Sequence, residues 1–334
     1  MTAPVFLTID TELTWRHQAR GLSWEENFRR SYDAAGVGVP WQLQVLRRHG
    51  LRACFFVDPM PALVHGLGPA KRMVEPILAA GQDVQLHLHP FWADLAAGRP
   101  PRFELTGMDE AEQAGLIRTA RDLLVEAGAP APVAFRAGSY AADGGTLRGL
   151  CANGIQYDSS LNASHPRVSR VPSPSALAPR AVDGVAEFPV GQIAAPDGPL
   201  RHLQIAAVSG AELEGALAHA KAEAHPLITI VGHSFELARR DGLRPVSTLV
   251  RRFERLCATL ERHGHPTLGG GDLRSVPLDR EMAPAVSPRL RRAARQAEQA
   301  WVNMRHERPA ELATAAAGTG MVGLEALLLI AAIE

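Results

Sequence analysis

The stretch VFLTIDTELTW, residues 5–15, carries two carboxylates directly after an apolar run. The run predicts a buried strand, Val5–Asp10. Side chains at positions i and i+2 of a strand point to the same side, so Asp10 and Glu12 would lie together near the carboxyl end. Two like charges at that distance usually have a metal, a cationic partner or a shared proton between them. The segment therefore predicts a functional site at the end of the first strand.

Apolar runs alternate with helix-period segments as far as about residue 270. The predicted strands are Val5–Asp10, Ala53–Val57, Asp83–His89, Val133–Arg136, Ile155–Asp158, His202–Val208, Leu227–His233 and Pro266–Leu268. The predicted helices are Trp24–His49, Pro69–Ala80, Asp109–Ala127, Thr146–Asn153, Gly210–Ala222 and Val246–His263. Glycines follow five of these helices, at Gly50, Gly81, Gly128, Gly154 and Gly264. This alternation is typical of an α/β fold with a parallel sheet, either open or closed into a barrel.

Ionisable residues stand at the ends of five predicted strands. They are Asp10, the pair His87 and His89, Arg136, Asp158 and His233. Catalytic groups of parallel α/β folds gather at the carboxyl ends of strands. We therefore expect these residues to share one site.

Composition restricts the class of protein. The chain has 334 residues, 46% of them apolar, and 35 basic against 35 acidic residues. This balance gives no reason to expect a nucleic-acid partner. Its three cysteines are odd in number and widely spaced, which predicts reduced thiols rather than a disulfide framework. The first strand begins at Val5 with no apolar leader before it, so we expect no signal peptide and a cytoplasmic protein.

Two segments depart from the alternating pattern. Residues 163–186 are rich in serine and proline and predict a long loop over the strand ends. After about Pro277 a basic amphipathic stretch, PRLRRAARQAEQAWVNMRHE, is followed by the apolar ending MVGLEALLLIAAIE. The ending is too short to span a bilayer, so packing on the barrel or on a second subunit is favoured over contact of these helices with a membrane.

The segment QDVQLHLHPFW, residues 82–92, contains an H-x-H pair. On a strand His87 and His89 face the same way, as two imidazole ligands of one divalent ion do. Such a pair also occurs by chance, and His263 with His265 is interpreted as a surface pair of that kind. Asp10 and Glu12 favour the first pair, because one carboxylate could complete the metal site while the other accepts a proton from water. A helix cap and a surface acid is the alternative for these two acids.

Two more strand ends suggest roles in catalysis. Arg136 could orient a carboxylate base through a bidentate contact, and Gly138 would let a backbone N–H approach an oxyanion. His233 beside a buried carboxylate could protonate a leaving amine or alkoxide. A structural salt bridge for Arg136 and a buried, satisfied imidazole for His233 are the alternatives.

This set of segments, in this order over roughly residues 4–275, resembles the NodB-homology polysaccharide deacetylases, a family of carbohydrate esterases. LTIDTE is similar to the family's T-F-D-D motif, LRACFFVDP to its K-A-T-F-F strand, and QDVQLHLHPFW to its histidine motif. FRAGSY resembles the arginine motif, YDSSL and IVGHS the last two motifs, and TLGGGDL the closing strand. The TxDTE and HLHP segments resemble one branch of the family.

The resemblance implies a distorted (β/α) barrel over residues 1–276, followed by a C-terminal helical extension over residues 277–334. It also implies a divalent metal ion, usually zinc. Its site residues would be the catalytic residues Asp10, Arg136, Asp158 and His233, the oxyanion and substrate residues Gly138 and Tyr140, and the metal ligands Glu12, His87 and His89. Asp10 would be the base with Arg136 as its partner, and Asp158 would pair with His233.

Three positions depart from the family pattern. Glu12 stands where aspartate is usual, Phe91 where the second metal histidine is usual, and Tyr140 one position later than the usual aromatic residue. Phenylalanine cannot bind metal, so either His89 substitutes or the site has one histidine fewer.

The sequence thus predicts a metal-dependent hydrolase that removes an acetyl group from an N-acetylated sugar or polysaccharide. A deacylase of a lipid-linked or nucleotide-linked sugar is the second hypothesis, favoured by the absence of an export signal and by the basic C-terminal helix. A metal-free, inactive sugar-binding relic of the fold is the third, suggested by Phe91 and the shifted tyrosine. The expected partner is an acetylated carbohydrate, with no nucleic acid.

Overall fold

The computed structural model describes residues 2–196 and 198–306. An eight-stranded sheet has strands β1 (Val5–Thr11), β2 (Cys54–Val57), β3 (Asp83–Leu88), β4 (Ala134–Ala137), β5 (Tyr157–Asp158), β6 (Arg180–Val182), β7 (Val185–Glu187) and β10 (Ile228–His233). A three-stranded sheet has β8 (Gln192–Ala194), β9 (Leu200–His202) and β11 (Ala285–Val286).

The helices lie mostly between successive strands of the large sheet. They are α1 (Trp15–Ala19), α2 (Trp24–Ser31), α3 (Val39–Arg48), α4 (Ala62–His65), α5 (Gly68–Ala79), α6 (Phe91–Ala96), α7 (Glu110–Glu126), α8 (Gly144–Ala152), α9 (Gly210–Ala222), α10 (Ser247–His263) and α11 (Arg289–His306). Four short 3₁₀ turns are η1 (Ala34–Gly36), η2 (Leu105–Gly107), η3 (Gly138–Tyr140) and η4 (Gly270–Ser275).

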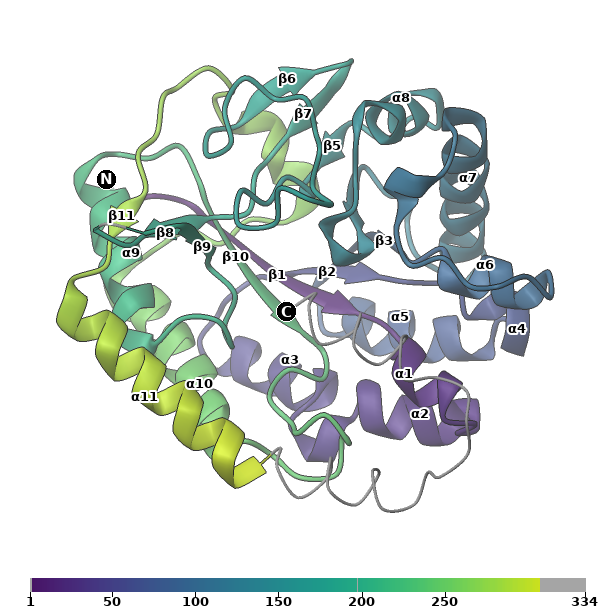
Figure 1. The fold of residues 1–334 in the computed structure, drawn as a ribbon, viewed down its shortest axis with the longest axis horizontal. Coiled ribbons are helices and arrows are strands. Elements are labelled where there is room, and N and C mark those ends of the chain that lie inside the picture. Colours follow the sequence, from purple (N-terminus) through teal and green to yellow (C-terminus); the bar gives the residue numbers. More distant parts are fainter. Residues whose placement is uncertain (1, 197, 307–334) are drawn as a thin grey trace. The chain divides into compact units, whose positions relative to one another are not determined.

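The large sheet has the order β10-β1-β2-β3-β4-β5-β7-β6 (Figure 1). Its strands pair in parallel from β10 through β7, and only the edge strand β6 runs antiparallel to its neighbour. Parallel neighbours need a crossover, and helices supply it between β1 and β5. The sheet curls into part of a barrel. The predicted α/β fold of the distorted-barrel type is confirmed.

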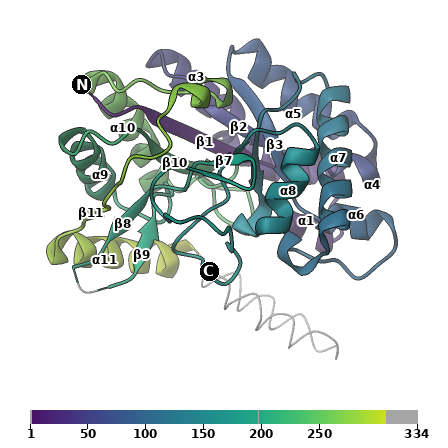
Figure 2. The same cartoon turned by 90° about the horizontal axis from the view of Figure 1, so that it is seen from above.

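Strand β1 lies in the interior of the sheet, and all seven of its residues are buried. Helices α5 and α7 pack against β2 and β3, along the outer side of the sheet (Figure 2). Apolar side chains of β1, β2 and β3 form the largest core cluster together with these helices. A strand covered on both faces has to be apolar along its length, which explains why a polar pair at its end stands out in the sequence.

Register brings the predicted site residues to one edge of the sheet. Asp10 of β1 is aligned with His233 of β10 on one side and with Phe56 of β2 on the other. His87 of β3 is aligned with Arg136 of β4. All of these lie near the carboxyl ends of parallel strands, as the sequence predicts.

Most predicted helices are confirmed to within one or two residues. The five glycines predicted to end helices all have positive φ angles, which disfavour residues with a Cβ. Gly264, at φ 63°, is the left-handed cap of α10. The single predicted helix Trp24–His49 is wrong, because it is two helices with a turn between Ser31 and Val39. A Cβ on Gly38 would lie 2.0 Å from the carbonyl oxygen of Tyr32, so this break needs glycine there.

Three further predictions differ from the structure. His202–Val208 is not a strand, because only its first residue belongs to β9 and Gln204 makes a single bridge to Val231. Leu203, Ile205 and Val208 are buried all the same, so burial alone accounts for this apolar run. The loop predicted over residues 163–186 contains β6 and the start of β7. Pro266–Leu268 contributes only the bridge between Val5 and Thr267.

The C-terminal part divides near residue 295. Met1–Arg295 forms one compact unit and Gln296–Glu334 a second. Within the first unit, Ser287 donates a hydrogen bond to Glu212 at 2.9 Å and Arg291 donates one to the carbonyl of Ala211 at 3.1 Å, both on α9. The predicted basic helix is α11, and the predicted apolar ending lies outside the described residues. The division predicted at residues 276 and 277 stays a prediction.

No helix in the described residues is long and apolar enough to cross a membrane. The three cysteines, Cys54, Cys151 and Cys257, are free, as predicted.

Candidate active site

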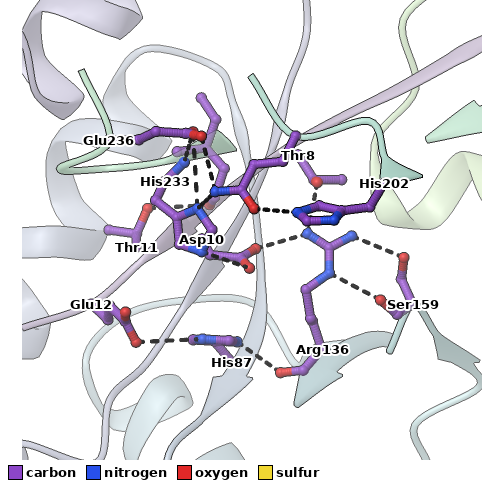
Figure 3. Close-up of polar contacts among 12 residues, drawn as sticks. Thr8, Asp10, Thr11, Glu12, His87, Arg136, Ser159, His202, His233 and Glu236 are labelled. Carbon is purple, nitrogen blue, oxygen red and sulfur yellow. Dashed lines mark hydrogen bonds and ion pairs between the residues drawn. The ribbon is translucent and has the colours of Figure 1, made fainter. Parts of the chain in front are cut away.

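Arg136 and Asp10 form a buried ion pair at the carboxyl ends of β4 and β1 (Figure 3). Arg136 Nη1 lies 2.8 Å from Asp10 Oδ1, and Arg136 is fully buried. The same nitrogen donates to Thr8 Oγ1 at 2.7 Å, while Nε and Nη2 donate to the carbonyl and hydroxyl oxygens of Ser159 at 3.0 and 2.9 Å. The predicted partnership is therefore present, but as a single contact rather than a bidentate one, because Ser159 takes the other donors.

Glu12, His87 and His89 converge on one point beside this pair. One ligand-type atom from each lies within 4.8 Å of the others, and all three residues are buried. Glu12 Oε2 is 2.5 Å from His89 Nε2 and 3.5 Å from His87 Nε2. His87 Nδ1 is 2.8 Å from the carbonyl oxygen of Arg136, which can only accept, so Nδ1 carries a hydrogen and Nε2 is the ring nitrogen that faces Glu12.

Electrostatics within the cluster are strong. Burial acts to raise the pKa of Glu12, but the two histidines outweigh it and hold that pKa well below its usual range. Burial acts to lower the pKa of His89, but Glu12 outweighs it and raises the pKa to about 9. The cluster thus gathers groups whose protons a metal cation could replace.

The residues present fit a divalent ion. Two imidazoles and one carboxylate are a donor set used for zinc, with further coordination positions left open. Fixing of the His87 tautomer through the Arg136 carbonyl is the kind of outer contact that accompanies metal-bound histidines. His89 Nδ1 and Asp58 Oδ2 are buried with no hydrogen-bond partner among the described residues. The side chains thus form a polar centre whose hydrogen-bonding capacity the described residues do not fill.

Gly138 makes room for His89. A Cβ at position 138 would lie 2.4 Å from Cε1 and Nδ1 of the His89 ring. Phe91, at the position where the family has its second histidine, begins α6 and stacks against Phe103 with ring centroids 5.7 Å apart. His89, and not Phe91, therefore supplies the second imidazole of the cluster. The backbone of η3 packs against the His89 ring.

Tyr140 lies close to the cluster but belongs to another group of side chains. Its ring packs near His165 and His202, with centroids 5.6 and 6.0 Å away. Its hydroxyl is buried and has no hydrogen-bond partner among the described residues. Burial raises the pKa of Tyr140 well above its usual value, so the hydroxyl stays protonated and can donate.

His233 lies on the far side of Asp10 from Arg136 (Figure 3). Its Nε2 is 3.8 Å from Asp10 Oδ2. Its Nδ1 is 3.9 Å from Glu236 Oε2 and 3.4 Å from Gln204 Nε2. The site thus contains a carboxylate, held by an arginine, within reach of an imidazole.

Asp158 is the predicted site residue that the structure does not bring into this group. The predicted pair with His233 is wrong, because Asp158 accepts a hydrogen bond from Ser160 at 2.6 Å and interacts with Glu187. Burial raises the pKa of both Asp158 and Glu187, so the two share a proton more readily than two exposed carboxyls would. Ser160 in turn accepts from the backbone of Ala137 at 2.9 Å, so this pair supports the end of β4.

Comparisons with solved structures identify the fold. A structure described as that of a candidate polysaccharide deacetylase from Mycobacterium smegmatis matches with a TM-score of 0.52 at 18% sequence identity, over 85% of this chain and 96% of that chain. The chain has the polysaccharide-deacetylase fold. The predicted resemblance to the NodB-homology deacetylases is thereby confirmed at the level of the fold.

Further structures, described as members of carbohydrate esterase family 4, match with lower TM-scores. They include a family 4 carbohydrate esterase from Streptomyces lividans in complex with acetate (0.40, 14% identity, 79% of this chain and 91% of that chain) and a CE4 family pseudoenzyme from Bacillus anthracis (0.42, 12% identity, 81% and 65%). No protein-family profile and no curated protein sequence matches the chain.

Several residues that build this site were not predicted from the sequence. Thr8 and Ser159 hold Arg136, Asp58 lies near the histidines, and Glu236 with Gln204 contacts His233. Thr8 had a signal, since it is two residues before Asp10 on the same strand face. Glu236 had a weaker one, its position three residues after His233 in the segment HSFE. Gln204 had none.

Proposed function

We propose that the protein is a metal-dependent hydrolase that removes the acetyl group from an N-acetylated sugar or polysaccharide. One observation carries the proposal: Asp10, paired with Arg136 at 2.8 Å, lies between the Glu12, His87 and His89 cluster and His233. A base, a candidate metal centre and a candidate acid thus meet at one edge of the sheet. The fold, which hosts polysaccharide deacetylases, agrees with this assignment.

Glu12, His87 and His89 would hold the ion, for which zinc is our proposal. When bound, such an ion polarises an acyl oxygen and makes water more acidic. The remaining steps belong to side chains of this chain.

Asp10 is the proposed base. Arg136 binds Oδ1 of its carboxylate, which leaves Oδ2 to accept a proton from the water that attacks the acetyl carbon. As the new C–O bond forms, negative charge develops on the acyl oxygen. Backbone N–H groups of the segment Gly138–Tyr140 are proposed to contribute to its stabilisation.

His233 is the proposed acid. Its Nε2 lies 3.8 Å from Asp10 Oδ2, so a substrate nitrogen bound within hydrogen-bond distance of Nε2 could receive its proton. Contact with Glu236 and the charge of Asp10 outweigh burial, and they raise the pKa of His233. Protonation of the leaving nitrogen accompanies cleavage of the C–N bond, and acetate and a free amine are the products. Proton transfer from Asp10 back to His233 through solvent completes the cycle.

An inactive relic is the less favoured alternative. A relic has no reason to keep Arg136 fully buried against Asp10, since a buried ion pair costs desolvation free energy. It also has no reason to gather a carboxylate and two imidazoles in one buried cluster. Cytoplasmic location, expected from the sequence, stays a prediction.

A panel of substrates tests the proposal. Purified protein, supplied with zinc, is incubated with N-acetylated and O-acetylated sugars, free, polymeric, lipid-linked and nucleotide-linked, and acetate is measured. Zinc-dependent release from N-acetylated members supports the proposal, and the best member names the substrate class. Zinc binding without release from any member would contradict it, and absence of both binding and release would favour the relic.

A further inference from the structure

His233 lies between two carboxylates that face its two ring nitrogens. Nε2 is 3.8 Å from Asp10 Oδ2, and Nδ1 is 3.9 Å from Glu236 Oε2 (Figure 3). In the proposed function the proton leaves from the Nε2 side, where Asp10 and the substrate lie. The groups at Nδ1 therefore decide how the ring is oriented and how well it holds a positive charge.

The Glu236 carboxylate is fixed without help from the His233 ring. Its Oε2 accepts from the backbone N–H of His233 at 2.9 Å. Its Oε1 accepts from the backbone N–H of Ala206 at 2.7 Å and from Gln204 Nε2 at 3.0 Å. Three donors from two segments thus hold a carboxylate that is only 8% exposed. A negative charge held in place this way costs little reorganisation when the imidazole becomes protonated.

Neighbouring residues make this arrangement possible. Gln204 Oε1 lies 2.7 Å from His202 Nε2, and an amide oxygen only accepts, so the Gln204 amide is oriented with its nitrogen toward Glu236 and His233. Gly232 leaves room for the carboxylate, because a Cβ there would lie 3.3 Å from Glu236 Oε2 and 2.9 Å from Ile205 Cδ1.

We propose that Glu236 is the positioning residue of His233: it holds the Gln204 amide against Nδ1 and places a negative charge beside the ring that stabilises the imidazolium, so that Nε2 carries the proton destined for the leaving nitrogen. The proposal rests on the function proposed above. It assigns to Glu236, three residues after His233, the role that the sequence resemblance gave to Asp158. Asp158 is instead occupied by Ser160 and Glu187.

Other charged groups around His233 are few. Asp10 of β1 and Glu12, just after β1, act on it by their charge, Glu236 follows β10, and His202 of β9 approaches through Gln204. Burial lowers the pKa of His202 to about 4, so that ring is neutral near pH 7. Asp10 acts at Nε2, which leaves Glu236 as the carboxylate that can act at Nδ1.

The test is an NMR titration of the His233 ring in the full-length, metal-free protein, in which no turnover is required. Glu236→Gln should lower the pKa of His233 by about one unit or more, the effect expected on loss of one close opposite charge. Asp158→Asn, the matched change of a buried carboxylate, should leave that pKa where it is. An unchanged pKa of His233 in Glu236→Gln, or an equal fall of that pKa in Asp158→Asn, would overturn the proposal.

Two additions keep the test informative. If Glu236→Gln does not fold, Glu236→Asp withdraws the charge by one methylene and should give a smaller fall in the same direction; no fall would count against the proposal. In the zinc-loaded enzyme, Glu236→Gln should lower kcat with little change in KM and move the alkaline limb of kcat to lower pH. Failure of the deacetylase assignment would remove only this kinetic result, because the titration is independent of activity.

Discussion

Arg136 Nη1 lies 2.8 Å from Asp10 Oδ1, and Thr8 and Ser159 take the other donors of the guanidinium. All three nitrogens of the guanidinium therefore donate hydrogen bonds to Thr8, Asp10 or Ser159. Its charge balances Asp10, and its shape fixes the direction from which the carboxylate can accept a proton.

Arg136→Lys should impair both catalysis and folding. A lysine keeps the charge but cannot reach Thr8, Asp10 and Ser159 together, so kcat should fall on the order of 10²-fold through misplacement of Asp10. Weakening a buried pair should lower the free energy of unfolding by about 3 kcal/mol. Steady-state kinetics and urea unfolding measure the two effects. Arg148→Lys, an exposed arginine that pairs with Glu110 and Asp183, is the control and should change neither.

Each residue of the proposed metal cluster should be needed for zinc binding. Glu12→Gln, His87→Ala and His89→Ala should each weaken zinc binding by at least about 10²-fold, since each removes one of three ligands. Calorimetry with zinc measures the affinity. His263→Ala changes the other H-x-H segment at an exposed position and should bind zinc as the unaltered protein does. Equal affinities for all four variants would place the ion elsewhere.

Gly138→Ala should disrupt the metal cluster through His89 alone. The added Cβ would meet the His89 ring at 2.4 Å, so either the ring or η3 has to move. We expect lower zinc affinity and lower turnover. The same substitution at Gly115, inside α7 with no atom within 4 Å of the new Cβ, should raise the free energy of unfolding by roughly 0.5–1 kcal/mol. A variant Gly138→Ala with normal zinc affinity would show that η3 does not hold His89.

The buried pair of Asp158 and Glu187 predicts how stability depends on pH. The pKa values of both groups are raised in the folded protein, first by burial, so the folded state binds more protons than the unfolded state above the ordinary carboxyl range. Their contribution to the free energy of unfolding is complete at pH values below the pKa of the unfolded state. It is lost as the pH rises through the pKa values of the folded state. Urea unfolding between pH 4 and pH 8 should show this loss, and Asp158→Asn should reduce it. An equally steep loss in the variant would assign the effect to other groups.

Much of the fold could be predicted because helices and buried strands have distinct apolar periods. Helices α5, α7 and α10 carry apolar residues at helical spacing and are each followed by a glycine within two residues. The prediction failed for His202–Val208, whose apolar residues are buried although the segment is not a strand. Local sequence cannot distinguish a buried irregular segment from a short strand.

The site was predictable as far as strand ends could be located. Asp10, Glu12, His87, His89, Arg136 and His233 meet because parallel strands end at one edge. The partner of His233 was not predictable in this way. Glu236 follows the strand in a turn, and Gln204 comes from a segment with no strand pattern, so their approach to His233 depends on tertiary packing.

Acetate release by Asp10→Asn tests the central claim most directly. Zinc-loaded Asp10→Asn and unaltered protein are compared on the best N-acetylated substrate, with zinc content and folding measured in the same samples, and with a chelated sample of each. We expect the unaltered protein to release acetate only with zinc, and Asp10→Asn to bind zinc yet lose at least about 10³-fold in kcat, as expected when a general base is removed. Turnover by Asp10→Asn close to that of the unaltered protein, or release that persists after zinc is removed, would contradict the account.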